Sequence, residues 1–257
     1  MPHNFFKGSL MMAAFLVLSC PAFSRQDDST KAVKYFSGSV LITNKGISTI
    51  PNFTLGKPAA IFNFSFGKKI RFEPELRFAL EGKPWMFIFW WRTELVKSDK
   101  FIFRLGANPT FAFKNISVTR NGVPDNLLVS YRTLTADLAP TYSITGKIGI
   151  GVYYMYVYGV EDFTTRNTNY LAIRAYFSEV RLSGQYFLKF TPQFYYLVQD
   201  GVSGTYVSTT LSLNKKNFPF YFATMANRPI RSDIPSGNKL LWNVSLTYTF
   251  SSTYIKK

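Results

Sequence analysis

Strict alternation between charged and apolar residues in the segment 70–78 is the feature that most constrains the fold of this chain. Successive side chains of a β-strand point to opposite faces, so the charged residues share one face and the apolar residues share the other. A soluble sheet would bury the apolar face, whereas a membrane barrel would turn it to lipid and turn the charged face to the lumen. The four charged residues of the segment are Arg71, Glu73, Glu75 and Arg77.

The same pattern repeats in about twelve segments, which turn residues separate, and no stretch has a helical period. We therefore expect a single all-β domain. Prolines inside four of the segments would break ladder hydrogen bonds unless bulges accommodate them, so we expect about 10 to 14 strands. These prolines are Pro74, Pro109, Pro140 and Pro192. The segments are 35–43, 60–67, 70–80, 85–96, 101–114, 127–142, 148–158, 170–180, 184–198, 206–214, 220–225 and 240–250.

The joins between these segments alternate mostly between short and long. An even number of strands also returns both termini to the same side. Together these features predict a transmembrane antiparallel up-and-down β-barrel with short periplasmic turns and longer outer loops. The long joins 44–59 and 115–126 are candidate contact loops if the barrel presents a binding surface instead of a channel.

The apolar faces are rich in aromatic residues, which make up 18% of the chain. If these faces contact lipid, each Arg or Lys placed among them near the midplane would cost roughly 2–4 kcal/mol. Four misplaced charges would then consume stability on the order of a whole domain's 5–15 kcal/mol. The charged residues of segment 70–78 are therefore expected in the lumen. Aromatic residues at segment ends suit interfacial girdles: Tyr35, Phe36, Trp85, Tyr158 and Trp242.

The N-terminus is typical of a secretory signal, with Lys7, an apolar run over 10–18 and a small-x-small site at 22–24. We expect a signal peptide over 1–24, a short periplasmic segment over 25–33, the barrel over 34–250 and a tail over 251–257. Lipidation of Cys20, or retention of the apolar run as an anchor, is the alternative. Cleavage would remove the chain's one Cys and one His, which excludes disulfides and Cys/His metal sites or nucleophile pairs.

The last segment carries a resemblance to a known family. In 240–250, Asn, Ser and Thr alternate with a face formed by Trp242, Val244, Leu246, Tyr248 and Phe250. This segment resembles the C-terminal strand of Gram-negative outer-membrane β-barrel proteins, and the resemblance covers 34–250. It implies an outer-membrane location, contact with outer-membrane lipid and recognition by the barrel-assembly machinery, although residues 251–257 follow the expected terminal aromatic. The aromatic-rich stretch 82–92 is also similar to uncharacterised barrels of the Bacteroidetes group.

The candidate functional residues are the charges expected on the lumen face. They form either a structural ion-pair network or a polar constriction that selects solutes. Basic residues outnumber acidic ones among them, so a pore should prefer anions. The expected lining is Arg71, Glu73, Glu75, Arg77, Arg92, Glu94 and Arg104, with Arg132, Asp137, Arg174 and Lys189 extending it.

Three apolar residues, Met86, Ile88 and Trp90, share the phase of Arg92. Either they fill part of the lumen, which would indicate partial plugging or a path for a hydrophobic ligand, or the alternation breaks near the loop-proximal rim. We favour the break.

Chain composition narrows the function classes. Lys and Arg number 30 against 14 acidic residues, a net charge of +16, but a secreted aromatic-rich chain makes nucleic acid a poor partner. Glu73 and Glu75 are flanked by Arg on the same face, which favours ionised structural roles over acid–base catalysis. We expect no enzyme activity and no cofactor. A small porin-like channel with possible anionic solutes is the function we favour. A plugged structural or surface-binding barrel is the alternative, and an outer-membrane hydrolase is a further one.

Overall fold

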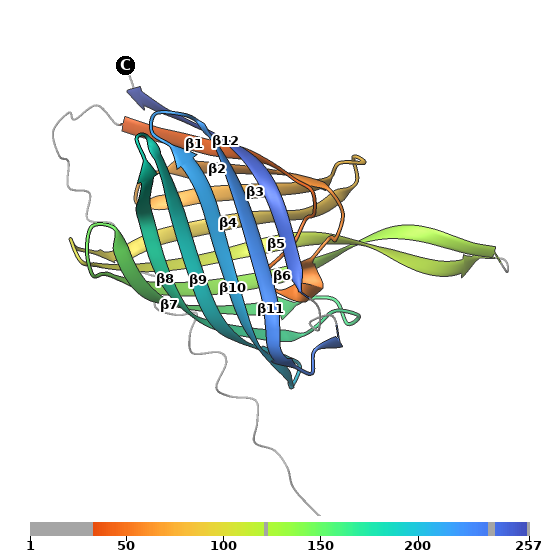
Figure 1. Ribbon diagram of the computed structural model, residues 1–257. Coiled ribbons are helices and arrows are strands. Elements are labelled where there is room, and N and C mark those ends of the chain that lie inside the picture. The colour runs from red at the N-terminus through yellow and green to blue at the C-terminus, as the bar shows by residue number, and fades with distance from the viewer. Residues whose placement is uncertain (1–32, 121–122, 236–239, 256–257) are drawn as a thin grey trace, which may run out of the picture.

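The computed structural model describes residues 33–120, 123–235 and 240–255, and the expected signal peptide lies outside these ranges. Twelve antiparallel strands form a closed barrel, as the alternating pattern predicts (Figure 1). No helix of the described chain is long and apolar enough to span a bilayer. The strands are β1 (Val33–Thr43), β2 (Ala59–Gly67), β3 (Ile70–Ala79), β4 (Pro84–Lys97), β5 (Phe101–Arg120), β6 (Val123–Ser143), β7 (Ile148–Gly159), β8 (Asn167–Ser183), β9 (Tyr186–Gln199), β10 (Val202–Lys215), β11 (Phe220–Ser232) and β12 (Leu241–Ile255).

Every strand pairs with its neighbours in the sequence, and β1 closes the barrel on β12. This last pairing runs from Val33 opposite Ile255 to Thr43 opposite Ser245. Residues 251–255, expected as a tail, therefore belong to the closing strand. Phe250 packs over Gly38 of β1, where a Cβ atom would lie only 2.6 Å from the Phe250 ring. The glycine thus makes room for the aromatic side chain across the seam.

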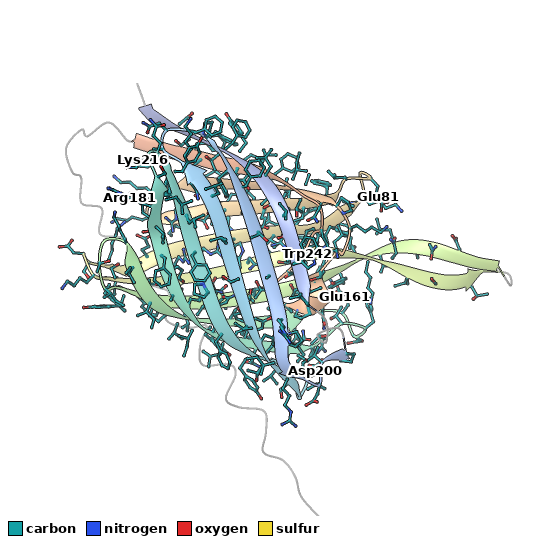
Figure 2. The ribbon with its side chains drawn as sticks, viewed as in Figure 1. Glu81, Glu161, Arg181, Asp200, Lys216 and Trp242 are labelled. Carbon is teal, nitrogen blue, oxygen red and sulfur yellow. The ribbon has the colours of Figure 1, made fainter. Side chains whose placement is uncertain are left out.

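The outward face of the barrel is apolar and open to its surroundings. Ile173 is 56% exposed, Phe222 59% and Trp242 49%, and many further outward Leu, Val, Phe and Tyr side chains resemble them. Such a continuous exposed apolar surface is foreign to soluble monomers but fits the hydrocarbon region of a bilayer. Figure 2 shows Trp242 on this outer wall.

The two ends of the barrel differ, as the joins predict. At the turn end, where both β1 begins and β12 ends, short connections include the ones beside Arg181 and Lys216 (Figure 2). The opposite, loop end carries Glu81, Glu161 and Asp200. The joins expected as periplasmic turns therefore lie at one end of the barrel, and those expected as outer loops lie at the other.

One expected loop is instead a projecting hairpin. β5 and β6 stay paired from Lys114 opposite Val129 to Arg120 opposite Val123. They form a two-stranded ribbon that extends well beyond the barrel at the loop end (Figure 1). The expectation of a long loop over 115–126 was therefore wrong. The dipeptide Asn121-Gly122 is a strong hairpin signal, and it should have corrected that expectation.

The four prolines split no strand. Each is paired with one neighbouring strand, such as Pro74 opposite Phe89 and Pro109 opposite Leu134. The pairing with the other neighbouring strand skips the proline and resumes in the same register. The described register shifts fall elsewhere, for example between Arg77 and Phe78. The prolines therefore need no additional strands to accommodate them.

Apolar side chains on β4 point inward. Met86 is 4% exposed, Ile88 8% and Trp90 8%, so the alternation does not break there and the interpretation that we favoured was wrong. Trp85 is not a girdle residue either, because it is buried and its indole Nε1 donates to the Phe53 carbonyl oxygen at 3.0 Å. Part of the lumen is consequently filled by apolar groups.

Candidate functional site

A wall of alternating charges occupies one side of the lumen, on β3, β4 and β6. Arg71 lies between two carboxylates, with Nε 3.1 Å from Glu73 Oε1 and Nη2 3.4 Å from Glu94 Oε1. Arg92 continues the chain, with Nη1 3.0 Å from Glu73 Oε2 and Nη2 3.4 Å from Asp137 Oδ2. Every carboxylate of this set faces an arginine, as sequence alternation predicts. We call these five residues the charged wall.

Two further contacts extend the charged wall. Tyr153 of β7 donates its hydroxyl hydrogen to Asp137 Oδ2 at 2.9 Å, and the Asp137 side chain is fully buried. The Arg92 guanidinium also lies 3.8 Å from the centre of the Trp90 ring. Stacking on an aromatic face and pairing with carboxylates together fix Arg92 in place.

The neighbouring pair Glu75–Arg77 repeats this arrangement closer to the loop end. Arg77 Nε donates to Glu75 Oε1, and the guanidinium lies 4.9 Å from the centre of the Trp85 ring. Glu73 and Glu75 are thus both held by arginines. Their arrangement matches the structural ion-pair interpretation of the sequence.

Three of the predicted lining cations have no carboxylate within ion-pair distance among the described residues: Arg104, Arg174 and Lys189. Arg104 Nε is buried without a hydrogen-bond partner there. Arg174 Nε donates to Gln193 Oε1 at 2.7 Å, and its guanidinium lies 3.9 Å from the centre of the Tyr153 ring. These cations leave the lumen lining with an excess of positive charge.

A ladder of tyrosines lines the lumen on β7 to β10. The ring centres of Tyr153 and Tyr170 are 5.9 Å apart, those of Tyr170 and Tyr195 4.7 Å, and those of Tyr195 and Tyr206 4.8 Å. All four side chains are buried, in a cluster that also holds Leu197. We call these four tyrosines the tyrosine wall. The alternation placed them on the inward face, but their residue type did not mark them as a unit.

The join 44–58 between β1 and β2 folds into the lumen rather than away from it. Ile47 is 7% exposed and Ile50 3%, and the short 3-10 turn η1 (Pro51–Phe53) lies between them and β2. Tyr195 donates its hydroxyl hydrogen to the Thr49 carbonyl oxygen at 2.8 Å. We call residues 44–58 the inward loop. Its burial contradicts the interpretation of this join as a surface contact loop.

Long-range hydrogen bonds hold the inward loop in place. The Asn52 side-chain amide donates to Gln199 Oε1 at 2.8 Å, and the Asn227 amide donates to the Thr49 carbonyl oxygen at 3.2 Å. Phe53 packs against both buried apolar clusters of the lumen. The loop therefore narrows the barrel between the tyrosine wall and β4.

Three cavities follow one another along the lumen. An outer cavity of about 520 Å³ at the loop end shares Phe53, Thr133 and Val157 with a middle cavity of about 250 Å³. The middle cavity shares Glu75, Trp90 and Arg92 with an inner cavity of about 570 Å³. Phe53 of the inward loop borders the first junction, and the charged wall borders the second.

The inner cavity is lined on the other side by small polar groups. Ser37 and Ser39 of β1, Asn63 and Ser65 of β2 and Thr249 of β12 contribute to it. Ser65 Oγ donates to Glu73 Oε1 at 3.4 Å. Charges on one side thus face hydroxyl and amide groups on the other, a lining that water and small ions can wet.

One predicted lining residue lies on the wrong face. Arg132 shares the outward phase with Leu134, its side chain is 59% exposed, and Nε lies 2.7 Å from Glu161 Oε1 in the β7–β8 loop. Burial of the Glu161 carboxyl raises its pKa, but the hydrogen bonds from Arg132 outweigh this and leave the pKa below the usual 4.5. Arg132 therefore anchors a loop at the rim instead of lining the lumen.

The remaining predicted positions lie where the alternation put them. Arg71, Glu73, Glu75, Arg77, Arg92, Glu94, Arg104, Asp137, Arg174 and Lys189 are on inward-phase positions. Trp242, Val244, Leu246 and Tyr248 face outward, and Phe250 joins an outer aromatic cluster with Phe36 and Phe64. Whether the assembly machinery reads this face stays a prediction. Sequence reasoning missed the tyrosine wall and the inward loop.

Comparisons with solved structures return membrane barrels of low similarity. NanC porin is 10% identical over 88% of this chain and 100% of that chain, with a TM-score of 0.46. KdgM porin is 10% identical over 84% and 99%, with a TM-score of 0.45. OmpT, an outer membrane protein of Vibrio cholerae, is 8% identical over 87% and 99%, with a TM-score of 0.43. No protein-family model matches the sequence, and no curated protein is significantly similar to it.

The fold is that of a transmembrane β-barrel. The closed twelve-stranded topology and the apolar exterior carry this conclusion, since likenesses at such identities and TM-scores say nothing about a solute. The resemblance of 82–92 to Bacteroidetes barrels stays a prediction.

Proposed function

We propose that the protein is a narrow outer-membrane channel through which small solutes diffuse passively, with a preference for anions. The observation that carries this proposal is the series of three cavities along the lumen, each sharing wall residues with the next. Twelve strands enclose more space than the eight-stranded barrels that side chains fill, and less than the sixteen-stranded aqueous porins. A constricted path is the expected intermediate.

The charge of the lining supports anion preference. The described carboxylates of the lumen, Glu73, Glu75, Glu94 and Asp137, all lie in ion pairs with arginine. Arg104, Arg174 and Lys189 remain without such partners and set the sign of the field. An anion passing these cations is stabilised, and a cation is repelled.

The proposal includes export and assembly but no catalysis. We propose cleavage of a signal peptide over 1–24 and insertion by the barrel-assembly machinery through the outward face of β12. Because Glu73 and Glu75 are both held by arginines, neither is poised as a general acid or base. Solute passage and not hydrolysis is therefore the role we assign to the lumen.

Conductance of the refolded chain 25–257 in a planar bilayer tests this proposal. Under a salt gradient we expect discrete current steps and a reversal potential on the anion-selective side. Folding is verified in the same preparation by electrophoresis, in which the unheated folded barrel migrates differently from the heat-denatured chain. A cation-selective reversal potential would overturn the anion preference.

A plugged barrel is the second candidate, and the inward loop is the observation that favours it. Tyr195, Asn227 and Gln199 all bond to this loop, so it is firmly held between the walls. Folded barrels that leave the bilayer silent would support this candidate and overturn the channel. The projecting hairpin of β5 and β6 would then be the surface on which to seek a role.

A further inference from the structure

Charged and apolar side chains meet in the middle cavity beneath the inward loop. The inward loop covers it with Ile50 and Phe53. Trp90, Tyr153 and Tyr170 supply aromatic walls. Arginine is the one basic residue type among its lining residues. The cavity therefore offers cations beside aromatic and aliphatic side chains.

Charge accounting leaves one arginine of this cavity without a carboxylate. Of the three that line it, Arg77 is paired with Glu75, and Arg92 is paired with Glu73 and Asp137. Arg174 Nε donates to the neutral side chain of Gln193, and no carboxylate of the described residues lies within ion-pair distance of Arg174. Its terminal amino groups thus have no ion pair among the described residues. A guanidinium whose terminal amino groups lack an ion pair favours a monoanion in such a site, because the anion accepts hydrogen bonds from these amino groups.

A second polar group points to the same ligand atom. The Tyr170 hydroxyl lies beside Arg174 and is buried, with no hydrogen-bond partner of acceptable geometry in the described chain. A buried hydroxyl without a partner costs free energy, which a bound acceptor would recover. One guanidinium and one hydroxyl together match the two oxygens of a carboxylate.

The remaining lining selects the body of the ligand. Met86, Ile88, Met155 and Val157 face the cavity together with Phe53. This surface gains from burying hydrocarbon or an aromatic ring. Six neutral polar residues line the rest of the cavity: Ser48, Thr49, Asn108, Thr110, Thr133 and Thr135. The volume of about 250 Å³ is below that of sites for drug-sized ligands. A single ring with a short chain fits this size.

We propose that the middle cavity binds small monocarboxylates with an apolar, preferably aromatic, body, whose carboxylate is held by Arg174 and Tyr170. The proposal rests on the proposed channel in one respect, because the ligand reaches the cavity through the lumen. It specifies the class of anion that the channel would bind. The paired arginines of the charged wall keep their carboxylates when the ligand binds.

Isothermal titration of the refolded chain 25–257 in detergent micelles tests the site without requiring conduction. The probe is 3-phenylpropionate, and the neutral 3-phenylpropanol and the small anion acetate are matched controls. We expect saturable binding of 3-phenylpropionate and at least tenfold weaker binding of both controls. If the alcohol bound as tightly as 3-phenylpropionate, the role of Arg174 would be overturned. If acetate bound as tightly, the requirement for an apolar body would be overturned.

Two variants test whether Arg174 and Tyr170 hold the carboxylate. Arg174→Gln should weaken 3-phenylpropionate binding about tenfold or more, which corresponds to the loss of one charge-assisted contact. Tyr170→Phe should weaken it several-fold and leave the discrimination against the alcohol in place. Arg181→Gln is the control, because Arg181 lies on the same strand but is exposed and paired with Glu179 at the turn end. Unchanged affinity in Arg174→Gln would overturn the proposal.

Conductance separates this site from the channel. Binding of 3-phenylpropionate by a silent barrel would refute the channel and keep the site. Conduction that 3-phenylpropionate neither blocks nor slows, together with absent binding, would refute the site and keep the channel.

Discussion

The charged wall and the tyrosine wall line the same lumen in opposite ways. On the charged wall, each carboxylate faces an arginine and Asp137 is fully buried. On the tyrosine wall, neighbouring rings pack with centres 4.7 to 5.9 Å apart, and Arg174 beside them lacks a carboxylate. The charged wall pairs its charges internally, whereas the tyrosine wall leaves the positive charge of Arg174 available to a solute.

This difference separates stability from selection. Breaking a buried ion pair leaves an uncompensated charge, so the charged wall should be sensitive to loss of a partner. The tyrosine wall gains its stability from ring packing, which tolerates removal of a hydroxyl group. Residues that stabilise the barrel and residues that select a solute therefore need not be the same.

Removing Asp137 should have the largest effect on stability. Asp137→Ala deprives both Arg92 and Tyr153 of their shared acceptor. We expect a loss of about 3–5 kcal/mol in the free energy of unfolding, measured by urea titration in lipid vesicles. Asp125→Ala in the exposed projecting hairpin is the control and should change little. Equal stabilities of the two variants would show that the charged wall does not hold the barrel together.

Loss of one hydroxyl on the tyrosine wall should have a smaller effect. Tyr195→Phe removes the hydrogen bond to the Thr49 carbonyl oxygen and keeps the stacked ring. We expect a loss of about 0.5–1.5 kcal/mol and faster proteolysis within the inward loop. Tyr196→Phe is the matched control, since Tyr196 is the next residue and faces outward. If Tyr195→Phe lost as much stability as Asp137→Ala, the contrast between the walls would fail.

The rim pair Arg132–Glu161 should have the smallest effect and depends on pH. Because the pKa of Glu161 is depressed in the folded state, the pair stabilises the protein above about pH 4.5 and this contribution disappears as the pH falls through the folded pKa. We expect Glu161→Gln to lose at most about 1 kcal/mol at pH 7 and progressively less as the pH falls through the folded pKa, by urea titration at each pH. A stability loss in Glu161→Gln that grew as the pH fell would contradict a depressed pKa of Glu161.

Period-two alternation predicted most of the barrel and most of its lining. It fixed the inward phase of Arg71 and Arg92 because side chains on a strand have no choice but to alternate. The same rule should have excluded Arg132, since Arg132 and Asp137 are an odd number of residues apart in β6 and cannot share a face of an unbroken strand. That error came from applying the rule incompletely.

The inward loop lay beyond sequence reasoning. Its contacts join residues far apart in the chain, such as Tyr195 and Thr49, which are 146 positions apart. Neither segment alone signals the other, and a join rich in Ser, Thr and Asn looks like any surface loop. The tyrosine wall was missed for a related reason, because its rings come from four separate strands.

Charge-selective labelling of two lumen cysteines tests the contrast between the walls most directly. The first cysteine is introduced by Thr191→Cys, since Thr191 lies on β9 between Lys189 and Gln193. The second is introduced by Ser65→Cys, since Ser65 lies beside Glu73. In refolded barrels, each is labelled with an anionic sulfonatoethyl and a cationic trimethylammonium-ethyl methanethiosulfonate, and the two rates are compared. We predict that the ratio of the anionic to the cationic labelling rate exceeds one at position 191 and is clearly lower at position 65. Equal rate ratios at both positions, or a preference for the cationic reagent at position 191, would contradict the account.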